Sequence, residues 1–275
     1  FLKLKKHRVK KPKLLFYCQH SMGMGHLVRS FRLAEELAEA FHVIFLNGGP
    51  VPAGINPPIN ITLINLPALG MSEQDHLLFS HDTRYSVDEA KLIRQQTILQ
   101  MFNQYQPEVI LIELFPFGRK KFADELIPLL SAAHQERSKP LVLCSLRDIL
   151  VQKRADQRRF ENQVSQTLNC YFHAVLLHCD PSFATLDEYF NPDITLQIPV
   201  FNTGFVAPPA ATGLNHCQKP RIIVSAGGGI VGGELYRTAI QAQKLIWVEA
   251  ELPMTLVAGP FLPEQEWQQL VGAAH

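Results

Sequence analysis

Short apolar runs alternate with longer amphipathic stretches along most of this chain. The apolar runs have the length of strands: 13–18, 42–46, 60–66, 109–114, 141–145, 174–178 and 195–198. The stretches between them have helical spacing of apolar residues: 27–40, 87–105, 119–138, 156–171 and 181–190. Strands that alternate with helices form right-handed βαβ units. The pattern therefore predicts an α/β fold with a doubly wound parallel sheet covered on both faces.

A second domain is predicted after a Pro- and Ala-rich segment at 206–220. A strand pattern follows at 221–225, then a helix at 234–248 and another strand at 254–258. We therefore predict four segments: a basic leader (1–12), an N-terminal Rossmann-like domain (13–205), a linker (206–220) and the start of a second Rossmann-like domain (221–275). About 55 residues are too few for a complete doubly wound domain, so we expect the second domain to be truncated.

Charge and cysteine content narrow the class of protein. The first 13 residues carry seven basic and no acidic side chains within a chain of net charge +1. Such a leader either makes weak contact with an anionic membrane surface or is simply solvated, and we expect no nucleic-acid partner. The five cysteines form no CxxC pair, which indicates reduced thiols and a cytoplasmic location. Cys179 beside His178 has no second ligand pair, so we expect no bound metal.

The turn after the first strand is the most informative local motif. It reads Gln-His-Ser-Met-Gly-Met-Gly-His over 19–26 and leads into a helix. Val28 stands where a dinucleotide fingerprint has its third glycine, and the second strand ends without an acidic residue, so an NAD site is not expected. His26 follows Gly25 where a ligand crevice is expected. It is either a base or an ordinary histidine at a helix start.

Two carboxylates lie at the carboxyl ends of predicted strands. Glu113 lies at the end of the run 109–114, and Asp148 follows the strand 141–145. Parallel strands bring these ends to one edge of the sheet. Either residue is a candidate to orient His26 or to act as the base itself. The alternatives are a satisfied buried carboxylate for Glu113 and a helix cap or an ion pair with Arg147 for Asp148.

A triple-glycine loop opens the predicted second domain. Gly227, Gly228 and Gly229 lie between a strand and a helix. A backbone without side chains can approach a diphosphate closely, and a helix N-terminus favours its negative charge. No Gly-Lys-Ser/Thr follows, so the loop is not a Walker A motif. A merely tight turn is the alternative.

Three motifs together resemble glycosyltransferases of the GT-B architecture, in particular the predicted bacterial enzymes related to family 28, which includes the peptidoglycan N-acetylglucosaminyltransferase. They are the turn 19–29, the strand end Leu146–Asp148 and the loop Ser225–Gly229. The resemblance implies two facing Rossmann-like domains with the active site between them.

The same resemblance implies roles for individual residues. The catalytic candidates are His26, Glu113 and Asp148. The acceptor-binding candidates are His20, Ser21, Gly23, Gly25 and Arg29. The donor-phosphate candidates are Ser225, Gly227, Gly228 and Gly229. A nucleotide-diphosphate sugar would be the donor substrate and a hydroxyl compound the acceptor, with no separate cofactor.

Three hypotheses about function follow from the sequence. The leading one is transfer of a hexosyl group from the donor to an acceptor hydroxyl. A second is a non-catalytic acceptor-binding or scaffold chain that needs a partner lobe. A third is a nucleotide-sugar epimerase of the same fold. Fold alone does not decide among them.

Overall fold

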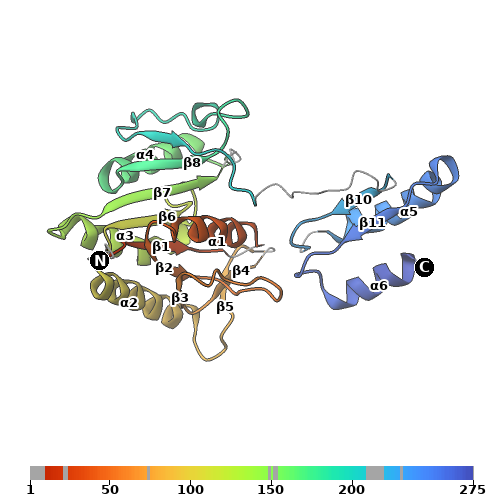
Figure 1. Cartoon of the computed structure of the whole chain (residues 1–275), viewed down its shortest axis with the longest axis horizontal. Coiled ribbons are helices and arrows are strands. Elements are labelled where there is room, and N and C mark those ends of the chain that lie inside the picture. The colour runs from red at the N-terminus through yellow and green to blue at the C-terminus, as the bar shows by residue number, and fades with distance from the viewer. Residues whose placement is uncertain are drawn as a thin grey trace, which may run out of the picture. The chain divides into compact units, whose positions relative to one another are not determined.

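The computed structural model describes residues 10–20, 24–72, 75–147, 150, 154–208, 220–229 and 232–274 (Figure 1). These residues divide into two compact units, and the chain passes from the larger to the smaller near Pro208. No helix in the described ranges is long and apolar enough to span a bilayer. The predicted basic leader lies mostly outside the described residues, as does most of the predicted linker.

The larger unit is built on a seven-stranded, fully parallel sheet with the order β3-β2-β1-β6-β7-β8-β9 (Figure 1). Its strands are β1 (Lys13–Cys18), β2 (His42–Asn47), β3 (Thr62–Asn65), β6 (Val109–Glu113), β7 (Leu141–Arg147), β8 (Ala174–His178) and β9 (Val200–Asn202). The strand order reverses direction between β1 and β6, as in doubly wound Rossmann-like sheets. The predicted fold class is confirmed.

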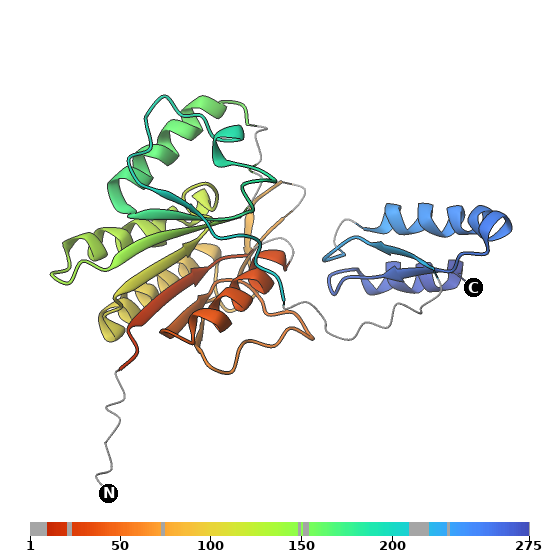
Figure 2. The ribbon, with the colours of Figure 1, turned by 45° about the horizontal axis from the view of Figure 1, so that its top comes forward.

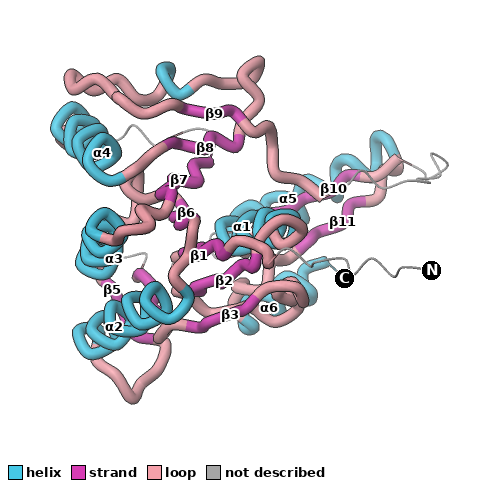
Figure 3. Tube along the Cα trace, turned by 60° about the vertical axis from the view of Figure 1, so that its left-hand side comes forward, coloured by secondary structure: helices cyan, strands magenta, loops and turns pink. Residues whose placement is uncertain are grey.

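Helices cover both faces of this sheet. Helix α1 (Gly25–Leu37) lies on one face, whereas α2 (Val87–Tyr105), α3 (Ala123–Gln135) and α4 (Gln157–Tyr171) lie on the other (Figure 3). The α1 contact is aromatic, because the Phe31 ring packs 5.0 Å from that of Phe45. Leu27, Phe31 and Ala34 have helical spacing and are buried, which explains why the local pattern alone identifies this helix.

Two predicted elements differ in the structure. The helix expected at 181–190 is only a 3-10 turn, η2 (Leu186–Glu188). Local side chains bind backbone groups in this segment: the Asp180 carboxylate accepts from the Ser182 amide, and Thr185 and Glu188 form a capping box at the start of η2. Side chains that satisfy local backbone groups compete with a continuing helix.

The strand expected at 195–198 forms farther along, as β9. The Asn169 side chain donates to the Thr195 carbonyl and accepts from the Gln197 amide, at 2.9 and 2.8 Å. These backbone groups are therefore satisfied from α4 instead of the sheet. A short antiparallel hairpin, β4 (Leu69–Met71) and β5 (Leu78–Ser80), is also present without having been predicted.

A fully buried arginine joins the central strand to two helices. Arg94 of α2 has no exposed surface, and its Nε and Nη2 donate to the two carboxylate oxygens of Glu125 on α3, at 2.7 and 2.6 Å. Nη2 also donates to Gln19 Oε1 at 2.6 Å and to the Tyr17 hydroxyl at 3.2 Å. The sequence analysis did not single out Arg94, although it occupies the stripe of buried residues along α2.

The same guanidinium fixes two loops. Its Nη1 donates to the carbonyls of Gly48 and Pro67, at 2.8 and 2.9 Å. A Cβ at Gly48 would lie 2.1 Å from Gln19 Oε1. The network thus holds the ends of β1 and β2 so close together that only glycine fits.

The smaller unit has a strand-helix-strand-helix sequence, which the blue part of Figure 2 shows. β10 (Ile222–Ser225) pairs in parallel with β11 (Met254–Val257), and they are followed by α5 (Gly233–Ala250) and α6 (Glu264–Ala274) respectively. The buried Tyr236 hydroxyl donates to the Val257 carbonyl at 2.7 Å and accepts from the Ala226 amide at 3.0 Å. One side chain of α5 therefore ties both strand ends together.

Replacing Arg94→Met tests the buried network. Removing one partner leaves the Glu125 carboxylate buried and unpaired, so we expect a loss of about 3–5 kcal/mol in the unfolding free energy. Both tryptophans, Trp247 and Trp267, lie in the smaller unit, so their fluorescence does not report on the larger unit. Urea unfolding is therefore followed by NMR signals of the larger unit. The matched control is Arg158→Met, which removes an exposed ion pair with Asp193. Equal losses in the two variants would contradict this prediction.

Candidate functional site

The candidate site lies where the strand order of the larger sheet reverses. β1 and β6 are neighbours there, with Tyr17 opposite Ile112. Glu113 is the last residue of β6, and the turn after β1 leads to His26 in the first turn of α1. Crevices at such switch points are the usual ligand sites of doubly wound sheets.

His26 and Glu113 form a direct pair. The distance from His26 Nδ1 to Glu113 Oε1 is 2.6 Å, although the residues are 87 positions apart. Arg29, one turn farther along α1, donates from Nη2 to the same oxygen at 2.6 Å. The Glu113 side chain is fully buried, whereas those of His26 and Arg29 are 17% and 19% exposed.

The environment keeps Glu113 ionised. Burial, the largest single effect, raises the pKa of its carboxyl group. The His26 hydrogen bond and the charges of His26, Arg119 and Arg29 together outweigh burial, so the pKa lies below the ordinary glutamate value. An ionised carboxylate only accepts hydrogen bonds, so Nδ1 of His26 carries the proton. In neutral His26, Nε2 is then the basic nitrogen, which is the state a general base requires.

A second arginine approaches Glu113 from the loop after β6. Arg119 Nη2 lies 3.8 Å from Glu113 Oε2, too far for a hydrogen bond, and the side chain is 13% exposed. Its backbone is in the left-handed region at φ 60°, as is that of Leu114 at φ 65°. The sequence analysis placed Arg119 at a helix start and gave it no role. The loop position directly after the strand that carries Glu113 was the available signal.

The structure brings some predicted acceptor-binding residues to this edge. His20 is buried two residues beyond β1, and burial lowers the pKa of its ring to about 4, which keeps it neutral. Gly25 is the first residue of α1, and a Cβ there would meet nothing within 4 Å. Ser21, Gly23 and Asp148 lie outside the described residues.

A hydrogen-bonded chain that the sequence analysis missed lies on the adjoining strands. Ser145 of β7 is opposite Leu176 of β8, two positions before His178 along that strand. His178 Nε2 lies 2.8 Å from Ser145 Oγ, and its Nδ1 lies 2.7 Å from Thr203 Oγ1. Burial lowers the pKa of His178 to about 4. The ring is therefore neutral when its two nitrogens form these hydrogen bonds with Ser145 and Thr203. No group of three or more potential metal ligands occurs within the described ranges.

The predicted donor-phosphate residues lie together in the smaller unit. Ser225 ends β10, and its Oγ accepts from the Gly227 amide at 3.3 Å. Gly227 and Gly229 have φ of 61° and 92°. Around Gly229 the loop is tightly packed, since a Cβ would lie 3.0 Å from the Gly259 carbonyl oxygen, whereas a Cβ at Gly227 would meet open space. Open space therefore lies beside the Gly227 Cα, while its amide is bound to Ser225 Oγ.

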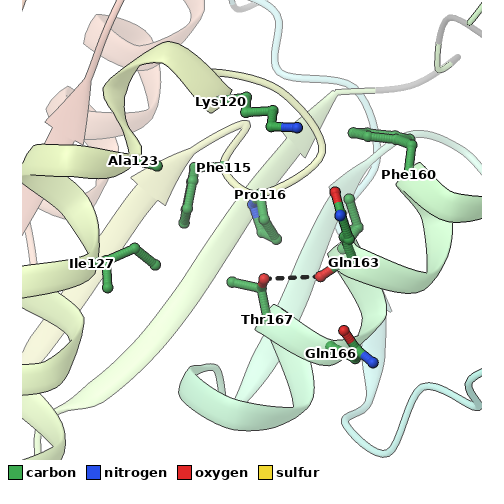
Figure 4. Close-up of a pocket in the computed structure, with 10 residues that line it drawn as sticks. Phe115, Pro116, Lys120, Ala123, Ile127, Phe160, Gln163, Gln166 and Thr167 are labelled. Atoms are coloured by element: carbon green, nitrogen blue, oxygen red, sulfur yellow. Dashed lines mark hydrogen bonds between the residues drawn. The ribbon is translucent and has the colours of Figure 1, made fainter.

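A separate pocket of about 270 Å³ lies between α3 and α4 (Figure 4). Phe115, Ile127 and Phe160 contribute apolar walls, and Lys120 lies at its upper rim in the view. None of the predicted site residues lines it. We therefore place the candidate site at the sheet edge and not in this pocket.

Glu113→Gln tests the electrostatics of the site. Because the folded-state pKa of Glu113 is lowered, its ionisation stabilises the fold above the unfolded pKa, and that stability is lost as pH falls through the folded value. We expect the variant to lose about 2 kcal/mol of unfolding free energy at pH 7. The difference from wild type should shrink as the pH falls below the ordinary glutamate value of about 4.3. Urea unfolding of the larger unit, monitored by NMR at several pH values, measures this. Glu35→Gln, at a half-exposed pair with Arg32, is the control; a pH-independent difference for Glu113→Gln would refute the assignment.

Comparison with known proteins identifies the fold. No family model matches the sequence, and no curated protein matches it. Among solved structures, Phytolacca americana UGT2 complexed with UDP-2-fluoro-glucose and pterostilbene aligns at TM-score 0.53 and 13% identity, covering 90% of this chain and 72% of that one.

Two further structures align similarly. The calicheamicin glycosyltransferase CalG4 gives TM-score 0.51 and 14% identity over 92% of this chain and 67% of its own. Anabaena HepE in complex with UDP and glucose gives TM-score 0.51 and 12% identity over 95% of this chain and 65% of its own. The fold of this chain is that of GT-B glycosyltransferases, with a central parallel sheet flanked by helices.

Proposed function

We propose that this chain is a glycosyltransferase that moves a hexosyl group from a nucleotide-diphosphate sugar to an acceptor hydroxyl. The observation that carries the proposal is the 2.6 Å pair of His26 and Glu113 at the switch point of a GT-B fold. A histidine oriented by a buried carboxylate is suited to removing a proton from a weak nucleophile such as a hydroxyl.

The proposed reaction assigns one step to each part of the pair. His26 Nε2 takes the proton of the acceptor hydroxyl while that oxygen bonds to the anomeric carbon of the donor. The bond from that carbon to the diphosphate oxygen breaks, and the nucleoside diphosphate leaves with the electron pair. Glu113 holds the ring in the required tautomer and stabilises the imidazolium that forms. Asp148, whose position is not described, stays a predicted alternative partner.

The glycine-rich loop of the smaller unit is the proposed donor-phosphate site. Open space beside Gly227 and the N-terminus of α5 shortly after the loop both suit an approaching diphosphate. Two of the structural neighbours are described with UDP or a UDP-sugar bound. These observations support UDP as the first nucleotide to test, whereas the hexose and the acceptor remain to be identified.

Other predictions remain open beside this proposal. The narrower similarity to family 28 rests on the turn 19–29, the strand end Leu146–Asp148 and the loop Ser225–Gly229. It stays a prediction, as do the cytoplasmic location and the membrane contact of the basic leader. The comparisons favour neither the scaffold hypothesis nor the epimerase hypothesis. Release of free nucleotide from a donor without any acceptor would favour the epimerase.

Gly227→Asn tests the donor site. Asparagine tolerates the left-handed backbone of Gly227, and its side chain enters open space. The variant therefore folds but obstructs the diphosphate, and we expect UDP affinity to fall at least about tenfold, or 1.4 kcal/mol. Calorimetric titration with UDP, GDP and TDP measures this.

Gly204→Asn is the matched control, because Gly204 also has positive φ and no atom within 4 Å of a Cβ. Unchanged UDP affinity in Gly227→Asn, or no nucleotide binding by wild type, would contradict the proposed donor site.

His26→Gln tests the proposed base. The amide keeps a hydrogen-bonding side chain but cannot take a proton, so we expect kcat to fall by about 10²–10⁴-fold while UDP affinity stays at the wild-type value. Release of UDP from UDP-glucose in the presence of an acceptor panel gives the rate, and calorimetry gives the affinity. Equal turnover by variant and wild type would remove His26 from the mechanism.

A further inference from the structure

Several buried polar atoms at the candidate site have no hydrogen-bond partner among the described residues. They are Glu113 Oε2, Arg119 Nε, Arg119 Nη2 and Arg29 Nε. A buried donor or acceptor without a partner costs about 1–3 kcal/mol, and more when it is charged. Such atoms therefore indicate where a ligand or water completes the structure.

The unpartnered atoms of Arg119 belong to one edge of the guanidinium. Nε and Nη2 are the two nitrogens with which Arg94 holds both carboxylate oxygens of Glu125. Arg158 uses the same two nitrogens for Asp193 on the surface. This edge matches the spacing of two oxygens in a carboxylate or phosphate. In Arg119 it is buried and makes no hydrogen bond within the described ranges.

The charges around this edge favour an anion. Arg29 and Arg119 bring two positive charges to the single carboxylate of Glu113, and Glu113 already shares one oxygen between Arg29 and His26. His26 also lies in the first turn of α1, where the backbone N–H groups carry partial positive charge. One negative charge brought by a ligand would balance the two arginines.

Glu113 Oε2 adds a second requirement. It is a buried acceptor without a hydrogen-bond donor, and a fully ionised carboxylate or phosphate cannot supply one. A ligand satisfies both requirements when it carries a hydroxyl beside its acidic group. The acidic oxygens then accept from Arg119, and the hydroxyl donates to Glu113 Oε2.

We propose that Arg119 is a specificity residue that binds a carboxylate or phosphate group of the acceptor, which makes the acceptor an acidic polyhydroxy compound. The inference rests on the proposed function, because it assigns this edge to the acceptor. The left-handed backbone at Arg119 fits such a role, since strained conformations cluster at ligand sites.

The test uses the full chain without any donor. Gluconate supplies a carboxylate beside hydroxyls, inorganic phosphate supplies the phosphate chemistry, and sorbitol is the neutral counterpart of gluconate. Each is titrated by calorimetry and by NMR of the Arg119 Nε–H signal, which is assigned from its absence in Arg119→Gln. We expect gluconate or phosphate to bind and to shift this signal, whereas sorbitol leaves it unchanged.

Two variants and one control locate the binding. Arg119→Gln should weaken the binding of the anion at least tenfold. Arg119→Lys keeps the charge but loses the paired nitrogens, so its affinity for the anion should lie between those of Arg119→Gln and wild type. Arg32→Gln removes a half-exposed arginine of α1 and should bind as wild type does. No anion binding by wild type, or equal binding by Arg119→Gln, would overturn the proposal. If Arg119→Gln fails to fold, Arg119→Lys, which also lacks this Nε–H, assigns the signal, and the titration of wild type then decides the question.

A further arm separates this inference from the proposed function. If UDP displaces the anion competitively, the Nε and Nη2 edge of Arg119 binds the donor diphosphate, and the acceptor assignment is wrong. A chain that binds the anion through Arg119 but never transfers a sugar would keep this inference and refute the transferase. A chain that glucosylates neutral and acidic acceptors at equal rates, unaffected by Arg119→Gln, would keep the transferase and refute this inference.

Discussion

The burial of Arg94 is the constraint on which the larger unit depends. A guanidinium without exposed surface must have its charge paired and its N–H groups bonded, and here α3, the end of β1 and two loops supply the partners. These elements come from distant parts of the chain and can satisfy Arg94 only in one arrangement. Gln19, the first residue beyond β1, belongs to the network, so the start of the turn that leads to His26 is held at the same time.

Two buried glutamates in the larger unit illustrate how similar groups serve different ends. Glu125 accepts from two nitrogens of Arg94 and from the Tyr17 hydroxyl, so both its oxygens are satisfied. Glu113 has both of its hydrogen bonds on one oxygen, and the other oxygen faces an arginine at 3.8 Å. The first arrangement stabilises the fold. The second leaves capacity for a ligand, which is why the chemistry is assigned to Glu113.

The elements that were predicted correctly are those whose signal is local. The buried stripe of α1 and the apolar runs of β1, β2 and β6 carry the periodicity of their own secondary structure. The failures have a physical cause outside that periodicity. Side-chain caps shortened the helix expected at 181–190 to a 3-10 turn, and Asn169 on α4 bound the backbone of the strand expected at 195–198. Both involve polar side chains that compete for backbone groups.

For the candidate site, the sequence by itself determined that Glu113 lies at the carboxyl end of a strand and that His26 begins the helix after the first strand, because element ends follow from local pattern. Only the tertiary structure decided that β1 and β6 are neighbours, which brings Nδ1 and Oε1 to 2.6 Å. It alone also placed Arg119 beside Glu113 and buried Arg94 among its partners. The reason is that strand order and burial arise from packing between distant segments, and no window of the sequence contains both sides of such a contact.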